Sequence, residues 1–381
     1  MADSVRLLIA RLLASVGADP FEDPDPEVAS VLADAAGRLG PYVGAAWLPD
    51  QTLRISSRPG PPVEPVVVSE PGDVSAVLEA AVNIGGEMLP GATAVRFDLD
   101  LDAPAVEERT RPHLGASHVG SIHVPTAARI AVLVGPGVVR AGAVDQLREF
   151  AERAGLPVVN TWGAKGVFDW QSPHHAGTAG LQERDFELCG FEDVDLIIAV
   201  GVDPEESPRH RWALAPVVDV DPVALAPLAA AWDRPPDTPE RPEIYTAMSA
   251  VVMPMFEQPG TPPHAVAQLK AALPPGGIAI ADPGPAGFWV ARTFPTSELG
   301  SVVVPATIAP GFAAAAAVVA GLRGRPAVAV TTAPTDETTR AVLDSAARRG
   351  VDVDLRVWDE NIDWSCLDSL VAVAGNVVAW T

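Results

Sequence analysis

Cysteine is scarce in this sequence, and its scarcity excludes a disulfide framework. The chain of 381 residues carries only Cys189 and Cys366. Two cysteines cannot staple a protein of this length, and such low usage is typical of a reducing compartment. The N-terminus places an acid, Asp3, before its first apolar segment and shows no secretory signature. We therefore expect a cytoplasmic protein.

Long apolar runs and an excess of basic residues are also lacking. No run of about 18 apolar residues occurs, so we expect a soluble protein without a membrane-spanning helix. The 49 acidic residues outnumber the 26 basic ones, and the net charge of −23 disfavours nucleic acid and anionic membranes as partners. The only lysines are Lys165 and Lys270, which we attribute to genomic composition rather than to chemistry. With 48% apolar residues, the chain is long enough for two or three domains.

Apolar runs that alternate with a helical pattern organise the stretch from residue 129 to residue 221. The runs are residues 130–134, 157–162, 194–200 and 217–221. They are continuous in apolar residues rather than alternating, which indicates parallel strands buried on both faces. Residues 144–154 have apolar side chains at helical spacing, and Gly155 follows as a left-handed cap. This pattern predicts a doubly wound α/β domain, in which ligands bind at the carboxyl ends of the strands.

Glycines follow the expected strand ends and are candidates for holding a ligand. The backbone amides of Gly135, Gly163 and Gly201 are placed to cradle a diphosphate. The alternative is that these glycines serve only tight turns. The run from Gly135 to Gly137 lacks the third glycine of a dinucleotide loop, so it is a weak Rossmann fingerprint. Acids within residues 203–206 follow Gly201 and would repel a diphosphate.

Two further α/β segments flank this central stretch. Before it we predict helices at 5–16, 28–39 and 73–84 and strands at 66–68 and 94–99. After it we predict helices at 265–273, 311–322 and 336–349 and strands at 278–282, 301–304, 327–330 and 351–358. The chain then divides into domains at 1–104, 129–232 and 264–381, with a linker at 105–128 and a Pro-rich linker at 233–263. The nine tryptophans, among them Trp289 and Trp358, are expected in the core rather than around a ligand.

Several short segments occur in an order that is typical of one enzyme family. In the central stretch they are residues 129–138, 140–143, 161–166 and 195–201. In the last domain they are residues 272–275, Asp282, Gly284, residues 289–292 and residues 311–312. By these segments, the central domain resembles that of thiamine diphosphate-dependent enzymes, most closely the large subunit of acetolactate synthase. Residues 264–361 resemble the diphosphate-binding domain of that family, and residues 66–104 resemble the tail of its pyrimidine-binding domain.

The resemblance implies an α/β fold with thiamine-enzyme-like parallel sheets. A central doubly wound domain would be flanked by a truncated pyrimidine-type domain and a diphosphate-type α/β domain. In some members the central domain holds FAD or an ADP moiety. The resemblance therefore implies six candidate cofactor-binding residues, among them Lys165. They are Gly135, Gly137, Gly163, Lys165, Gly201 and Asn361.

The metal-binding motif of the family is altered. Family members place Gly-Asp-Gly after the strand that corresponds to residues 327–330 and an Asn after the next strand. The Asp and the Asn ligate Mg²⁺, which clamps the cofactor diphosphate through oxygen ligands. Here the triplet is Thr332-Ala333-Pro334, which offers no carboxylate and includes a proline without a backbone N–H. Asn361 remains at about the expected place, and Asp336 could substitute only in a rebuilt loop.

Two other parts of the thiamine site are missing. The bulky residue that bends the cofactor aligns with Pro310, and the polar pair after Gly284 is replaced by Pro285 and Ala286. The Glu that starts the cofactor chemistry belongs to the front half of a pyrimidine domain that is too short here to contain it. We therefore name no catalytic and no metal-ligating residue, and we expect neither thiamine diphosphate nor Mg²⁺ to bind.

These departures indicate a degenerate thiamine-enzyme homologue without its own thiamine catalysis. We expect it to act as a structural or regulatory partner, of itself in a homodimer or tetramer or of a catalytic paralogue. One alternative is an active thiamine diphosphate-dependent 2-oxo acid lyase or carboligase with rebuilt ligands. Another is a module that binds a flavin or a nucleotide such as FAD or ADP.

Overall fold

The computed structural model describes residues 4–18, 20–40, 43–56, 64–86, 92–105, 128–332, 336–358 and 361–380. The predicted linker at 105–128 therefore falls almost wholly outside the described residues, as do Ala333 and Pro334 of the altered metal motif. The chain divides into two compact units. The first unit contains residues up to 116 together with 309–324 and 334–353, and the second unit contains the rest.

A mixed sheet of five strands forms the centre of the first unit, in the order β1-β2-β3-β5-β4. Its strands are β1 (Pro20–Phe21), β2 (Gly44–Leu48), β3 (Thr52–Ser56), β4 (Val66–Val68) and β5 (Ala92–Phe97). Strand β3 runs antiparallel to both β2 and β5, whereas β1 and β4 pair in parallel at the two edges. The sequence patterns predicted β4 and β5 but not β2 and β3. Strand β3 contains a charged residue, Arg54, whose buried guanidinium pairs with Asp34 at 2.9 Å.

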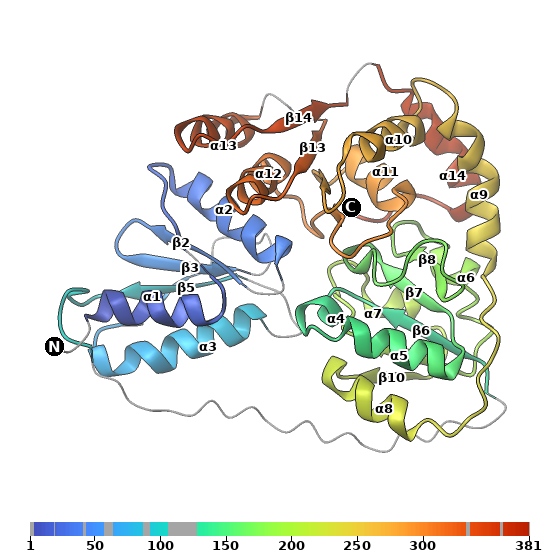
Figure 1. Ribbon diagram of the computed structural model, residues 1–381, viewed down its shortest axis with the longest axis horizontal. Helices are drawn as coiled ribbons and strands as arrows, with labels where there is room; N and C mark the ends of the chain where they lie inside the picture. The colour runs from blue at the N-terminus through green and yellow to red at the C-terminus, as the bar shows by residue number, and fades with distance from the viewer. Residues whose placement is uncertain are drawn as a thin grey trace. The chain divides into compact units, whose positions relative to one another are not determined.

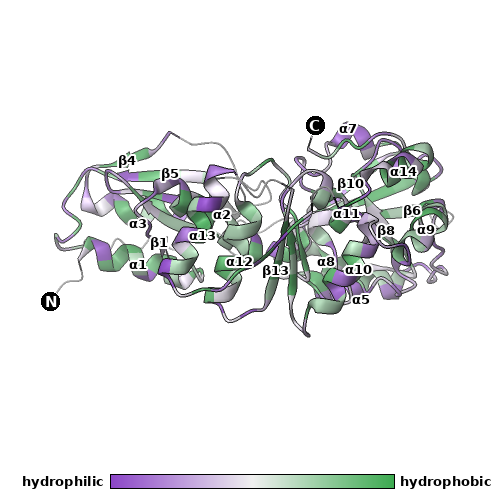
Figure 2. Cartoon of the chain, turned by 90° about the horizontal axis from the view of Figure 1, so that it is seen from above, coloured by the Kyte–Doolittle hydropathy of each residue, from purple (hydrophilic) through white to green (hydrophobic). Residues whose placement is uncertain are grey.

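Helices cover both faces of this sheet. Helices α1 (Val5–Ser15) and α3 (Val74–Gly86, after a 3-10 turn at Pro71–Asp73) pack on one face, against side chains such as Leu53, Ile55 and Val95. Helix α2 (Pro26–Leu39) packs on the other face, where Ala29 and Ala33 contact Ala46. The outer side of α2 contacts α12 (Phe312–Leu322) and α13 (Glu337–Arg348). Helix α12 is apolar and buried on nearly every side, which an interior position requires (Figure 2).

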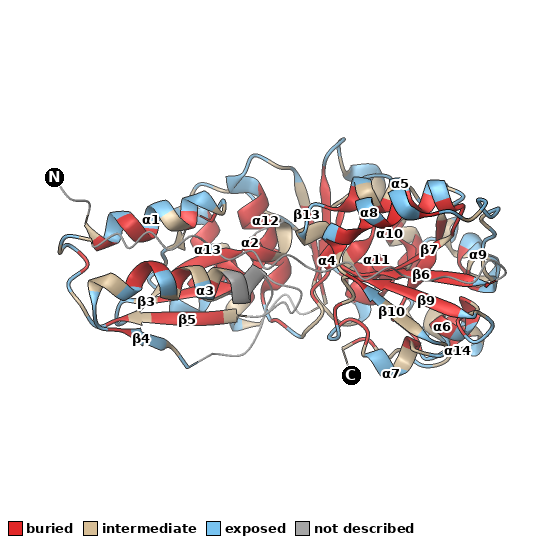
Figure 3. Ribbon diagram, turned by 90° about the horizontal axis from the view of Figure 1, so that it is seen from below, coloured by how far each residue is buried: buried red, intermediate tan, exposed pale blue. Residues whose placement is uncertain are grey.

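The larger sheet of the second unit is parallel throughout, as the apolar runs predicted. Its order is β10-β9-β6-β7-β8. The strands are β6 (Ile130–Val134), β7 (Val158–Thr161), β8 (His175–Ala179), β9 (Leu196–Val200) and β10 (Val217–Val220). Strands β6, β7 and β9 are buried along their length (Figure 3). Strand β8 was not predicted, because His-Ala-Gly-Thr-Ala contains no branched apolar side chain.

Successive side chains of these strands enter two separate cores. Ile130, Val132 and Val134 pack against α5 (Val144–Ala154) and α8 (Leu225–Ala231, after a 3-10 turn at Pro222–Ala224). Ala131 and Leu133 belong to the core on the opposite face, which also contains side chains of α6 (Asp185–Leu188), α7 (Arg209–Trp212) and α9 (Glu243–Phe256). The predicted cap at Gly155 is confirmed, with φ of 67°. The sheet is therefore doubly wound.

A second parallel sheet in this unit has the order β12-β11-β13-β14. Its strands are β11 (Ile278–Ala281), β12 (Val302–Val303), β13 (Ala327–Thr331) and β14 (Asp354–Val357). Helices α10 (Pro262–Ala272), α11 (Pro285–Thr293) and α14 (Leu367–Ala374, after a 3-10 turn at Trp364–Cys366) belong to the same unit (Figure 1).

Two features of the last third differ from the sequence prediction. The Pro-rich linker expected at 233–263 contains a helix that was not predicted, α9, with Pro254 in its last turn. Helices α12 and α13, expected with the last domain, group with the first unit. Among the residues that the structure describes, none of the helices combines the length and apolar character that a membrane span requires.

Candidate functional site

Three of the predicted ligand-binding glycines are brought together by backbone packing. The loop after β6 meets the loop after β9, where the Gly137 N–H donates to the Gly201 carbonyl oxygen at 2.9 Å. A Cβ atom added to Gly137 would lie 2.6 Å from the Gly201 Cα atom, and one added to Gly135 would lie 2.4 Å from the Gly201 carbonyl oxygen. Gly201 also has φ of +59°, which favours glycine. Contact between the two loops therefore accounts for these glycines without a ligand.

The fourth candidate amide, that of Gly163, already binds a carboxylate. Its N–H donates to Glu206 Oε2 at 3.0 Å, and the Thr161 hydroxyl donates to the same oxygen at 2.5 Å. Glu206 is buried, with 1% of its surface exposed. The Gly163 N–H that would hold a phosphate is therefore already engaged by this carboxyl group. The acids within residues 203–206 indicated in the sequence that a diphosphate would be disfavoured here. The sequence did not show that Glu206 is the acid that turns inward.

The two remaining candidates lie apart from this glycine cluster. Asn361 follows β14 in the other sheet, near the turn between α9 and α10 where the Asp363 N–H donates to the Gly260 carbonyl oxygen at 2.7 Å. Lys165 follows the 3-10 turn Trp162–Ala164 after β7 and points into a separate cavity. The six predicted residues therefore do not form one site.

A cavity of about 430 Å³ lies at the carboxyl ends of β11, β13 and β14. We call it the tryptophan cavity, because its lining includes Trp289, Trp358, Trp364 and Trp380. Thr332, next to the end of β13, supplies the only hydroxyl of the described lining, which contains no carboxylate, amide side chain or cation. Two tryptophans that the sequence placed in the core, Trp289 and Trp358, are indeed buried and also face this cavity.

This position is where the family resemblance places a magnesium-bound diphosphate, and the residues present do not fit that group. Mg²⁺ and phosphate need oxygen ligands, N–H donors and cations. The described lining is instead aromatic and apolar. In the described residues, no cluster of three or more His, Cys, Asp or Glu side chains could hold a metal ion.

The C-terminal segment closes one side of the tryptophan cavity. The Trp380 indole N–H donates to the Pro305 carbonyl oxygen at 2.7 Å, and its ring lies 5.4 Å from that of Trp162. Trp380 has φ of 62°, an uncommon conformation for a bulky residue. These contacts hold the segment despite that local strain.

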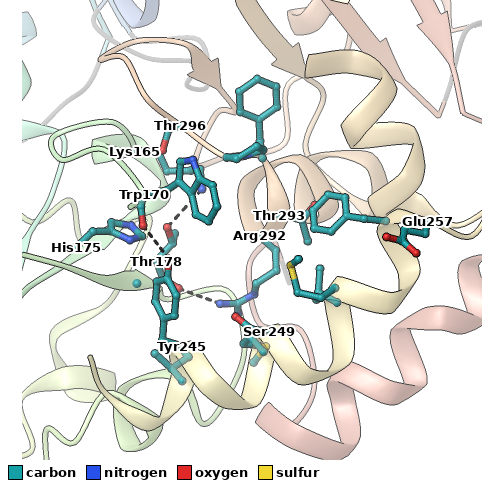
Figure 4. Close-up of a pocket in the computed structure, with 18 residues that line it drawn as sticks. Lys165, Trp170, His175, Thr178, Tyr245, Ser249, Glu257, Arg292, Thr293 and Thr296 are labelled. Atoms are coloured by element: carbon teal, nitrogen blue, oxygen red, sulfur yellow. Dashed lines mark hydrogen bonds between the residues drawn. The ribbon is translucent and has the colours of Figure 1, made fainter. Parts of the chain in front are cut away.

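A second cavity, of about 330 Å³, contains Lys165 and is called the lysine cavity below. One wall comes from strand β8, through His175 and Thr178. Helix α9 and its C-cap residue supply a wall from Ile244 to Glu257, and the end of α11 with the segment after it supplies residues 292–296. Figure 4 shows Lys165, His175 and Thr178 grouped on one side of the cavity.

Burial changes the ionisation of the lysine and the histidine in this cavity. Lys165 is 6% exposed, and burial together with repulsion from Arg292 lowers the pKa of its amine from 10.5 to about 7. Burial, with smaller contributions from Lys165 and Arg241, lowers the pKa of His175 to about 3. At neutral pH the imidazole is therefore uncharged and the amine is divided between its two forms.

The cavity also contains a buried ion pair. The Arg292 guanidinium donates to both carboxylate oxygens of Asp185, at 2.7 and 2.8 Å, and to the Thr178 carbonyl oxygen at 2.9 Å. The Lys165 ammonium is 3.5 Å from the Thr178 hydroxyl, and no carboxylate pairs with it among the residues that the structure describes. Lys165 therefore carries the unbalanced charge of this cavity. The sequence analysis named Lys165 as a candidate, but it did not predict that the amine lies without a carboxylate partner among the described residues.

Comparison with known proteins identifies the central part of the chain. Residues 123–226 match the family described as "Thiamine pyrophosphate enzyme, central domain". The acetolactate synthase of Mycobacterium leprae is 27% identical over 183 residues, which cover 38% of this chain and 29% of that enzyme. The large subunit from Mycobacterium tuberculosis is also 27% identical, over 38% of this chain and 30% of its own length. That from Parasynechococcus marenigrum is 30% identical, over 49% and 28%. The chain thus spans less than a third of the length of these relatives.

The fold resembles a solved structure over most of the chain. A crystal structure of a candidate thiamin diphosphate-dependent enzyme from Mycobacterium smegmatis superposes with a TM-score of 0.61 at 18% identity. The superposition covers 94% of this chain and 88% of that one. The resemblance inferred from the sequence is therefore confirmed. The chain contains a thiamine pyrophosphate enzyme central domain and is a distant homologue of the acetolactate synthases of the thiamine diphosphate enzyme family.

Proposed function

We propose that this chain is a homologue of the thiamine diphosphate enzymes that performs no thiamine chemistry itself. In this proposal it acts in the cytoplasm as a structural or regulatory partner, either of a second copy or of a catalytic paralogue. The observation that carries the proposal is the tryptophan cavity. It lies where a diphosphate would be held, and its described lining has aromatic rings in place of charged or amide ligands.

The charge of a diphosphate explains why this lining matters. A magnesium diphosphate that enters a low-polarity cavity loses its hydration, and this described lining offers no carboxylate oxygen for the metal and no cationic side chain for the phosphates. The Ala333-Pro334 pair in the sequence reduces the available ligands further. Both observations favour loss of the cofactor over a rebuilt cofactor site.

The packing of the central domain is the second support for the proposal. Gly135, Gly137 and Gly201 are engaged by one another's backbones, and Glu206 occupies the amide of Gly163. These contacts disfavour the alternative of a flavin- or nucleotide-binding module. The proposal assigns pairing with a second copy or with a paralogue to the retained fold.

Calorimetric titration with thiamine diphosphate and Mg²⁺ tests the proposal. We expect no saturable heat with ligand up to about 1 mM, which corresponds to a binding free energy weaker than about −4 kcal/mol. The melting temperature is expected to be the same with and without the cofactor, since a ligand that does not bind the folded state cannot stabilise it. An acetolactate synthase titrated under the same conditions is the positive control. Micromolar binding, or acetolactate formation from pyruvate by the purified chain, would contradict the proposal and support the rebuilt enzyme.

A further inference from the structure

The lysine cavity holds one buried ammonium group with no acid to balance it. Lys165 is more than nine-tenths buried, and its nearest recorded polar contact is the Thr178 hydroxyl at 3.5 Å. The charge of Arg292 is balanced by Asp185, whose carboxylate is fully buried. Glu257, the one carboxylate of the described lining, is exposed and lies at the opposite side of the cavity from Lys165 (Figure 4). The end of the cavity beside Lys165 therefore carries an excess positive charge whenever Lys165 is protonated.

Hydrogen-bonding capacity is also left over beside this charge. The Arg292 Nε–H and the His175 Nδ1 atom are both buried and have no partner in the described structure. Unpartnered buried polar atoms are rare in folded proteins, because each loses its hydration without compensation. Polar atoms without partners around an unbalanced cation mark a place where an anion would be stabilised.

The rest of the cavity is apolar. Helix α9 contributes Met248, Val252 and Phe256, and the segment after α11 contributes Phe294. A volume of about 330 Å³ lies at the lower end of the range for small-molecule sites, which begins near 300 Å³. A ligand that satisfies both parts must be small and must combine one anionic end with an apolar body.

We infer that the lysine cavity binds a small organic carboxylate with an apolar body, whose carboxylate lies beside Lys165 and whose apolar part packs against α9. This site is distinct from the tryptophan cavity and from the contact between Gly135, Gly137 and Gly201. The inference does not depend on the proposed function, since the chain could bind such an acid with or without thiamine chemistry.

Binding of this kind is coupled to protonation. A carboxylate next to Lys165 favours the charged amine, so its pKa rises and binding takes up a proton at pH 7 and above. The other groups facing Lys165 keep one charge state in this range. Burial keeps His175 of β8 neutral and raises the pKa of Tyr245 of α9 above 10, and the Arg292 guanidinium of α11 is paired with Asp185. Affinity should therefore fall as the pH rises from 7 to 9.

Calorimetry with benzoate, and with benzamide as its neutral isostere, tests the inference on the full chain. We expect benzoate to bind at pH 6.5 and benzamide to bind at least about tenfold more weakly, which is a difference of about 1.4 kcal/mol. Above pH 7 the affinity for benzoate should fall by up to about tenfold per pH unit. Lys165→Met should weaken benzoate binding by at least about tenfold and abolish its pH dependence.

Lys270→Met is the matched control, because Lys270 is the other lysine of the chain and does not line the cavity. It should bind benzoate like the wild type. Thermal melting checks that both variants are folded. Equal binding of benzoate and benzamide, unchanged affinity in Lys165→Met, or no benzoate binding at up to about 10 mM would each overturn the inference.

Discussion

Lys165 is the residue whose surroundings differ most from what its type predicts. A lysine is almost never fully buried without a partner, because its ammonium loses hydration. The sequence analysis identified Lys165 through a family motif and grouped it with Gly135, Gly137 and Gly201 as one cofactor site. In the structure these glycines pack against one another, away from Lys165. Its burial could not be predicted, since the walls around it come from α9 and α11, far along the chain. Long-range packing, not local pattern, sets the ionisation of this amine.

Stability should report the same ionisation. The pKa of Lys165 is lower in the folded chain, about 7, than the ordinary value of 10.5, so the unfolded chain binds more protons between those values. The contribution of Lys165 to wild-type stability therefore becomes less unfavourable as the pH increases from 7 to 10.5. Below pH 7, burial of this amine lowers the unfolding free energy by its largest amount. Lys165→Met removes this cost. We expect the variant to exceed the wild type in unfolding free energy at pH 6, by up to about 5 kcal/mol.

Urea denaturation of both proteins from pH 6 to pH 10 measures this difference. The variant's advantage should shrink steadily above pH 7 and nearly vanish as the pH approaches 10.5. Lys270→Met, whose lysine is only half-buried, should show no comparable trend. A Lys165→Met curve parallel to that of the wild type would mean that the amine titrates normally.

At the scale of elements, apolar runs predicted strands well and polar or small-residue strands poorly. Strands β6, β7, β9 and β10 lie where Val and Ile cluster. Strands β3 and β8 were missed, because a buried ion pair or small side chains replace the apolar pattern. The candidate site failed for a related reason. Glycine at a strand end shows that two backbones approach, but it does not show whether the neighbour is a ligand or another loop.

The ion pair between Asp185 and Arg292 connects α6 to α11. Asp185 also accepts the backbone N–H groups of Leu181 and Gln182, at 2.8 and 3.0 Å. Breaking a buried pair by neutralising one partner leaves the other charge uncompensated, which typically costs about 3–5 kcal/mol. Asp185→Asn keeps the shape of the side chain and should therefore lower the unfolding free energy by about that amount.

Glu187 provides the matched control two residues away on the same helix. It pairs with Arg184 at 2.6 Å, but both side chains are exposed. Exposed pairs contribute little because water and salt screen them. Glu187→Gln should leave urea unfolding nearly unchanged. Equal losses of unfolding free energy in Asp185→Asn and Glu187→Gln would contradict the prediction that the buried Asp185–Arg292 pair stabilises the contact between α6 and α11.

At the scale of the whole molecule, the sequence predicted the α/β class and the parallel central sheet but not how distant segments combine. Helices α12 and α13 follow β12 and β13 in the chain, so connectivity suggested that they complete the last domain. They instead belong to the first unit, where α2 contacts both of them. The sequence contained one sign of this arrangement. Helix α2 is apolar around much of its circumference, which a helix with one covered face does not need.

Polar contacts join the same segments. Asp23, just before α2, accepts hydrogen bonds from Ser345 and Arg348 of α13, at 2.5 and 3.1 Å. Thr338 donates to Glu27 at 2.6 Å. The first unit therefore depends on residues more than three hundred positions apart, as the separation of 322 residues between Asp23 and Ser345 shows.

A fragment of residues 1–105 should consequently fail to fold as a stable domain. It retains the whole β1–β5 sheet, but it lacks α12 and α13 and so exposes the part of α2 that they contact. Helix α2 is buried on much of its surface in the full chain, including at Val31, Ala35 and Ala36. The fragment also lacks three partners of the Asp23 carboxylate, which are Ser345, Arg348 and Arg349. We expect broad, non-cooperative thermal unfolding by circular dichroism and strong binding of a hydrophobic dye, as for a collapsed state without fixed packing. The full chain under the same conditions is the reference. Sharp unfolding of the fragment without dye binding would contradict this prediction and show that α12 and α13 are dispensable for folding of the β1–β5 sheet.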